Sequence, residues 1–178
     1  QDIQSLYTIK DTLTEEGFGD VRNGGLLASR SIVAGQAGER SVTGGPVDWT
    51  TQAGWFLDFD QSDSPGERVT LDPDQQLGVV RVVANVPDDK ICRPTAQSWI
   101  YTLNYQNGLY VPLTTRAIAG TRVFSSSLAA GARTIKVGER TMSLITDDAG
   151  RINVISSAAP GSSTPTARRV SWQELDEQ

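Results

Sequence analysis

The most informative stretch for the architecture is valine-rich, GVVRVVANV at residues 78–86. β-branched valines fit a pleated sheet and lose side-chain freedom in a helix, so these residues are predicted to form a strand. Further alternating or aromatic stretches, bounded by glycine, asparagine or aspartate, lie at residues 4–10, 54–59, 66–70 and 98–104. Their period of two is typical of strands. The sequence therefore predicts an all-β protein with little helix.

The last third of the chain continues this pattern. Two alternating stretches, 141–146 and 151–156, enclose DDAG at 147–150, which predicts a hairpin with a loop of about four residues. RRVSW at 168–172 is predicted to be a last short strand. Residues 157–166 contain only Ser, Thr, Pro, Gly and Ala, and are predicted to form a flexible surface loop. Residues 26–28 and 127–130 are expected to form single helical turns.

Composition narrows the class of protein. The 178 residues are 38 % hydrophobic and 21 % charged, which is typical of one globular domain, here residues 1–178. No apolar run approaches the roughly 20 residues of a membrane-spanning helix. The net charge of −5 argues against a nucleic-acid partner.

The chain contains no histidine, and so lacks the commonest general base and the commonest neutral metal ligand. We therefore expect no catalytic residues and no enzyme activity. The single cysteine, Cys92, cannot form an internal disulfide; it is either a buried thiol or half of a bridge to another chain. The first residue, Gln1, is not methionine, which predicts a processed chain or a segment of a longer one.

Several motifs occur in one fixed order: GWFLD at 54–58, GERV at 66–69, NVP at 85–87, Cys92 and SWIYTL at 98–103. SLYTIKD at 5–11 precedes them and RRVSWQEL at 168–175 follows them. This order resembles the C-terminal β-propeller region of the type IV pilus biogenesis and tip-associated adhesin family (PilC/PilY). The resemblance covers most of the chain.

The resemblance implies that the chain forms the last blades of a longer β-propeller. It also implies an exported protein at the bacterial cell surface, at the pilus tip or in the outer membrane, that supports pilus biogenesis and adhesion. The implied partners are minor pilins and a host-surface ligand.

Members of this family can bind calcium. The nearest match to a calcium loop here consists of Asp58, Asp60 and Asp63, but it lacks the sharp-turn glycine and a distal carboxylate. We interpret it as a solvated acidic turn and expect no cofactor in this segment.

The aromatic residues divide into two groups. Trp55 and Trp99 lie within predicted strands and are expected in the core, because aromatic rings bury large apolar areas. Tyr105 and Tyr110 flank a predicted turn at 107–108 and are expected to be exposed, which makes them the candidate ligand contacts.

The predicted function is non-catalytic attachment within a type IV pilus system. One alternative is a carbohydrate-binding β module of a secreted surface protein, which would present a row of exposed aromatic rings. A fragment of a quinoprotein-like propeller enzyme is less favoured, because nothing in the sequence supplies a cofactor site.

Overall fold

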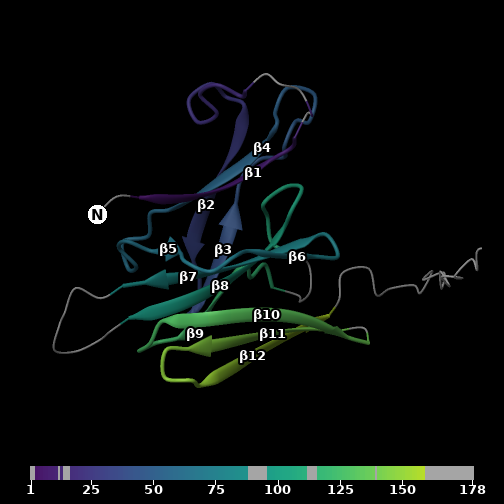
Figure 1. Cartoon of the computed structure of the whole chain (residues 1–178). Helices are drawn as coiled ribbons and strands as arrows, with labels where there is room; N and C mark the ends of the chain where they lie inside the picture. The colour runs from purple at the N-terminus through teal and green to yellow at the C-terminus, as the bar shows by residue number, and fades with distance from the viewer. Residues whose placement is uncertain are drawn as a thin grey trace, which may run out of the picture.

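The computed structural model describes residues 3–11, 13, 17–87, 96–111, 116–138 and 140–158 of the chain (Figure 1). Within those residues it contains strands and no helix, so the all-β prediction is confirmed. The strands are β1 Gln4–Ile9, β2 Leu27–Ala34, β3 Glu39–Thr43, β4 Gly54–Phe59, β5 Arg68–Val69, β6 Asp74–Gln76, β7 Val79–Val86, β8 Gln97–Asn104, β9 Gly120–Phe124, β10 Ala129–Val137, β11 Arg140–Asp147 and β12 Ile152–Ala158.

Most strands belong to one curved sheet in the order β1-β4-β2-β3-β9-β8-β7-β5, with β6 also paired to β7. Strands β1 and β5, at the two ends of this order, contact each other, so the sheet nearly closes into a barrel. The pair β2–β4 is parallel and the other pairs are antiparallel. Strands β10, β11 and β12 form a separate antiparallel sheet beside β7, β8 and β9 (Figure 1).

The prediction of propeller blades is wrong for the described residues. A propeller repeats four-stranded antiparallel blades made from consecutive strands. Here strands remote in sequence are neighbours: β2 runs parallel to β4, and β3 pairs with β9. Alternating strands and tight turns suit a blade and a barrel equally well. The two folds are distinguished by pairings between strands that are distant in sequence, such as Leu27 with Gly54, and no local sequence pattern encodes these pairings.

The strongest sequence patterns match the observed strands. The stretches 4–10, 54–59 and 78–86 contain β1, β4 and β7, the stretch 98–104 covers all of β8 except its first residue, and the predicted hairpin is β11–β12. The stretch 66–70 is reduced to the two residues of β5.

Other local predictions need correction. The prediction of helical turns at 26–28 and 127–130 is wrong, because these residues lead into β2 and β10. A short apolar run is compatible with either a helix or a strand, so the sequence pattern did not distinguish them. Strand β12 runs to Ala158, so the loop predicted at 157–166 cannot begin before residue 159. Its remaining residues, the strand predicted at 168–172 and Cys92 lie outside the described residues.

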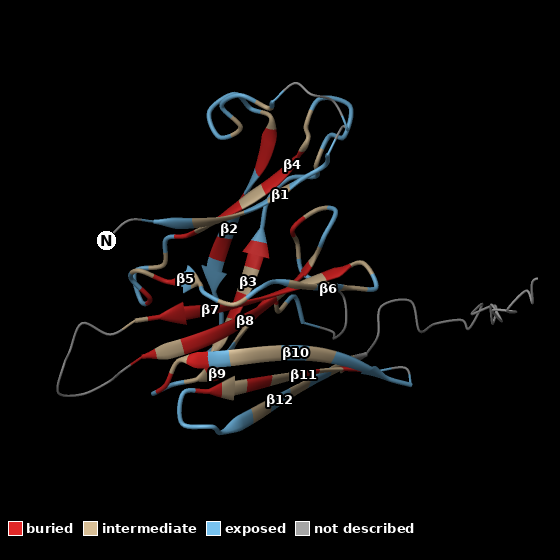
Figure 2. Cartoon of the chain, viewed as in Figure 1, coloured by how far each residue is buried: buried red, intermediate tan, exposed pale blue. Residues whose placement is uncertain are grey.

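The interior of the barrel is the main core. Trp55 of β4 and Trp99 of β8 are both buried there, as predicted. Most of strand β7 is buried (Figure 2). Its residues belong to cores on both faces: Ala84 and Val86 to the barrel interior, and Val83 to the core outside the barrel. Burial on both faces explains why the sequence of β7 is a nearly continuous apolar run.

A second core joins the two sheets. Val83, Ile100 and Val123 on the outside of the barrel pack against Ala129 and Ile145 of the smaller sheet. No helix long and apolar enough to span a membrane is found among the described residues.

Hydrogen bonds of polar side chains also connect the two sheets. The side-chain oxygen of Asn85 accepts hydrogen bonds from the amide of Ala129 at 2.9 Å and from the Ser98 hydroxyl at 2.7 Å. The side-chain amide of Asn85 donates to the carbonyl of Ala129 at 2.9 Å. Because these groups are buried, the contacts hold β10 in a defined position against β7 and β8.

Candidate functional site

A surface groove of about 440 Å³ lies beside Tyr105, one of the two tyrosines predicted to contact a ligand. Its lining combines two aromatic rings with polar and aliphatic side chains: Thr8, Ile9, Lys10, Trp49, Tyr105 and Gln106. These residues come from the end of β1, the loop before β4 and the turn after β8. Trp49 and Tyr105 are 42 % and 37 % exposed, so both line the groove while remaining partly open to solvent.

The turn that carries Tyr105 is held by its own hydrogen bonds. The side-chain oxygen of Asn104 accepts from the amides of Gln106 at 2.8 Å and Asn107 at 3.3 Å. The side chain of Gln106 donates to the Tyr105 hydroxyl at 3.0 Å. Gly108 adopts a φ of +68°, which glycine accepts without strain. The turn therefore presents Tyr105 in one orientation.

The barrel core supports the same turn from below. The buried indole of Trp55 donates a hydrogen bond to the carbonyl of Tyr105 at 2.9 Å, and buried Arg30 donates to the carbonyl of Asn107 at 2.6 Å. Gly108 lies against the Trp55 ring so closely that a Cβ there would come within 2.5 Å of Cδ2. Only glycine fits this position without displacing the ring.

Trp49 lies on a second rigid turn. The carboxylate of Asp48 accepts hydrogen bonds from the amide and hydroxyl of Thr50 and from the hydroxyl of Thr51. The hydrogen bond from the Thr50 hydroxyl is the largest of the effects that lower the pKa of Asp48. The amides of Thr51 and Gln52 donate to the Asp48 carbonyl at 3.0 and 2.7 Å. Both turns that carry the aromatic walls of the groove are thus held by hydrogen bonds.

The structure separates the two predicted contact residues. Tyr110 is 38 % exposed, as expected, but it does not line the groove and instead forms an isolated bridge with Leu103. Sequence reasoning did not single out Trp49. The signal that could have identified it is its place in DWTT at 48–51, one residue after GGP at 44–46, because an aromatic residue in a tight turn has little core to enter.

The GERV and SWIYTL motifs supply a charged cluster inside the barrel, not a surface site. Arg40 of β3 donates to Glu67 at 2.7 Å, and the Tyr101 hydroxyl donates to the same carboxylate at 2.7 Å. All three side chains are at most 1 % exposed. The Arg40 guanidinium lies over the ring of Trp99, with its carbon 3.6 Å from the ring centroid. This cluster ties β3, β8 and the residues before β5 together.

Burial controls the ionisation of this cluster. It raises the pKa of the Glu67 carboxyl above its ordinary value, and the nearby Arg40 charge and the Tyr101 hydrogen bond only partly oppose the effect. Burial, together with the adjacent Glu67 charge, also raises the pKa of the Tyr101 hydroxyl well above its ordinary value. Tyr101 therefore stays protonated and acts as a hydrogen-bond donor. We interpret the cluster as structural.

The three aspartates of the calcium candidate do not converge. Asp58 forms an ion pair with Arg22 at 2.6 Å, and Asp63 forms one with Arg40 at 2.9 Å. Burial alone would raise the pKa of Asp58, but hydrogen bonds from Arg22 and Ser5 lower it overall. Within the part of the chain that is described, no group of three acidic or cysteine side chains is placed to hold a metal ion.

Comparisons with known proteins identify no relative. No family model matches the chain, and neither a curated protein nor a solved structure matches it significantly.

Proposed function

We propose that this protein is a non-catalytic attachment module and that the Trp49–Tyr105 groove binds a carbohydrate. The observation that carries the proposal is the convergence of two exposed aromatic rings, from two separate and hydrogen-bonded turns, on one groove. The negative face of an aromatic ring favours contact with the positively polarised C–H groups on the apolar face of a sugar ring.

The neighbouring polar groups suit the hydroxyls of a sugar. Gln106 offers its acceptor oxygen and the amide hydrogen that Tyr105 does not use, Thr8 offers a hydroxyl, and Lys10 offers three donors. The groove of about 440 Å³ lies within the range of roughly 300–1,000 Å³ for small-ligand sites. Because both turns are held in place before binding, little conformational entropy is lost when a ligand enters.

The test is a titration of the purified chain with a panel of soluble oligosaccharides, followed by NMR and calorimetry. We expect saturable binding in the micromolar to millimolar range, and at least a tenfold loss, about 1.4 kcal/mol, in Trp49→Ala and in Tyr105→Ala. Tyr110→Ala is the matched control, since it removes an equally exposed tyrosine outside the groove. Equal losses in Tyr105→Ala and Tyr110→Ala, or no saturable binding, would count against the proposal.

A second proposal is attachment within a type IV pilus system, with minor pilins and a host-surface ligand as partners and export to the cell surface as the location. Its support is the motif order in the sequence. Several residues of those motifs are buried, namely Glu67, Trp99 and Tyr101. These residues stabilise the fold and do not contact a partner, so the motif order says more about the packing of the core than about a binding surface. The test is co-elution of the chain with purified minor pilins, against a mixture with an unrelated β protein. Failure to co-elute removes this proposal and leaves the carbohydrate proposal standing.

A further inference from the structure

The outer face of the β10–β12 sheet, the side turned away from the barrel, is apolar. Cross-strand register places its side chains in rows, for example Ile135 beside Met142, and Leu144 beside Val154. Six apolar residues share this face: Ile135, Val137, Met142, Leu144, Ile152 and Val154. Four of them, all except Met142 and Leu144, are 46–62 % exposed.

The opposite face of the same sheet is mixed: Ala129 and Ile145 pack against the barrel, and hydroxyl groups lie beside them. Thr134 and Ser143 are hydrogen-bonded at 3.1 Å, and Thr141 and Ser157 at 2.9 Å. Arg81 of the barrel donates to Thr141 at 2.8 Å. A sheet with one solvated face normally puts its polar residues toward water. This sheet carries apolar residues on both faces, although the barrel covers only the inner one, which indicates that something also covers the outer face.

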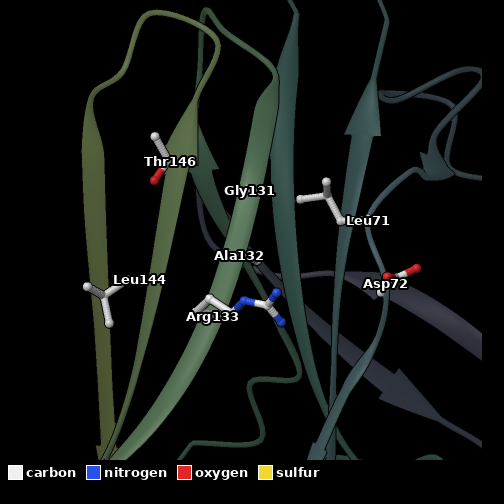
Figure 3. Close-up of a pocket in the computed structure, with 7 residues that line it drawn as sticks. All are labelled: Leu71, Asp72, Gly131, Ala132, Arg133, Leu144 and Thr146. Atoms are coloured by element: carbon white, nitrogen blue, oxygen red, sulfur yellow. The ribbon is translucent and has the colours of Figure 1, made fainter.

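A hollow of about 430 Å³ lies at the β10 edge of the outer face, over Gly131 and bordered by the barrel residues Leu71 and Asp72 (Figure 3). Leu71 lies on one side of β10, and Leu144 and Thr146 lie on the other (Figure 3). A Cβ on Gly131 would meet no atom within 4 Å, and its φ is outside the left-handed region. The hollow therefore has room for a bulky side chain from elsewhere.

The size of the face helps to identify its occupant. The three strands have 9, 8 and 7 residues, which at a rise of about 3.3 Å and a spacing of about 4.8 Å give an area of roughly 380 Å². A stable interface between separate proteins takes about 800 Å² from each partner. A second copy is thus too weakly held by this face alone. A segment attached to the sheet by a short linker has an effective concentration in the millimolar range and needs less area.

Such a segment follows β12 directly. In an extended conformation, Val170, Trp172 and Glu174 project from the same side of the chain, because side chains alternate. Thirteen residues, 159–171, separate Trp172 from the end of β12 and reach up to roughly 43 Å, enough to cross the sheet. We propose that residues 168–174 lie across the outer face of the β10–β12 sheet, with the Trp172 ring in the hollow over Gly131.

Charge on the face supports this occupant. Arg133 and Arg140 share the outer face with the apolar residues, and neither has an ion-pair partner among the described residues. Glu174 lies two residues beyond Trp172 on the same side of the extended segment and can pair with Arg133 at the rim of the hollow. Two apolar side chains and one acidic side chain thus match an apolar face with arginines at its border.

The experiment uses the full chain labelled with 5-fluorotryptophan, which reports all four tryptophans by ¹⁹F NMR. Trp172→Phe assigns the resonance of Trp172. We expect this resonance to differ from that of free 5-fluorotryptophan and to return to the free position in Gly131→Leu, which fills the hollow. Leu144→Lys, which places a charge on the outer face, should do the same. Gln173→Ala is the control, because residue 173 projects to the opposite side.

The outcomes separate the occupants. The proposal is overturned if the Trp172 resonance lies at the position of free 5-fluorotryptophan and does not change in Gly131→Leu or Leu144→Lys. A shifted resonance that returns to the free position on dilution, with a monomer–dimer equilibrium in sedimentation, shows docking onto a second copy and also overturns it. A shifted resonance that is independent of concentration and sensitive to both outer-face variants supports it. This test is independent of carbohydrate binding at the other groove.

Discussion

The indole nitrogen of Trp55 donates a hydrogen bond to the carbonyl oxygen of Tyr105 at 2.9 Å, and this contact joins the barrel core to the aromatic groove. Trp55 is fully buried, whereas the Tyr105 ring is partly exposed. The rigid interior therefore positions one wall of the groove. Substitutions in the core should change the properties of the surface turn.

Trp55→Phe tests this link. The variant keeps an aromatic ring but removes the donor to Tyr105, which should lower the free energy of unfolding by about 1–3 kcal/mol. Amide hydrogens of residues 104–109 should exchange faster, measured by mass spectrometry. Trp99→Phe is the matched control, because the indole nitrogen of Trp99 has no hydrogen-bond partner among the described residues. Equal exchange at 104–109 in the two variants would contradict the link.

Gly108→Ala should be strongly destabilising. It introduces a side chain at a φ of +68° and places a Cβ 2.5 Å from Trp55 Cδ2. Strain and overpacking together should cost about 2–4 kcal/mol in urea denaturation. Gly150→Ala separates the two effects, since Gly150 has a φ of +78° but open space around its Cβ, and its expected cost is about 1 kcal/mol. A similar loss of unfolding free energy in Gly108→Ala and Gly150→Ala would mean that the close approach to Trp55 does not contribute to the destabilisation.

Arg40→Met should be costly, because it leaves the Glu67 carboxylate buried without its partner. The expected loss is about 3–5 kcal/mol of unfolding free energy. Arg40→Met combined with Glu67→Gln should lose clearly less than the sum of the two single variants, because the double variant contains no buried unpaired charge. A double-mutant cycle by chemical denaturation measures the difference. Additive costs would show that the two groups do not stabilise each other.

Asp147 should contribute a pH-dependent part of the stability. Burial alone would raise its pKa, but the hydrogen bonds from Arg151 and Ser127 lower it below the ordinary value of 3.8. The unfolded chain therefore binds a proton more readily at this site, so its contribution is present above about pH 4 and is lost as the pH falls through the lowered pKa.

The measurement is the melting temperature between pH 7 and pH 2.5 in the wild type and in Asp147→Asn. The wild type should lose more stability than the variant over the acidic part of this range. Glu67, whose raised pKa acts in the opposite direction, is present in both proteins and cancels in the comparison. Parallel curves would contradict the role assigned to Asp147.

Local patterns predicted individual strands well and the groove only in part. The valine run of β7 and the aromatic stretch of β4 were predicted because burial imposes composition on a strand. Tyr105 was predicted as an exposed contact from its place beside a turn. Trp49 was not singled out, although it forms the opposite wall of the groove. The two rings are 56 positions apart in the chain (105 minus 49), and no local rule brings such residues together.

Local sequence was enough to predict that the chain is all-β, which residues form its central strands, and that Trp55 and Trp99 are buried. These properties depend on side-chain shape and on a period of two, which are local. Long-range packing sets the rest: the strands form a nearly closed barrel and not propeller blades, Arg40 pairs with Glu67, and Trp49 and Tyr105 line the same groove. Each of these depends on pairing between distant segments, such as the parallel register of β2 with β4. Such a register is selected by the packing energy of the whole core.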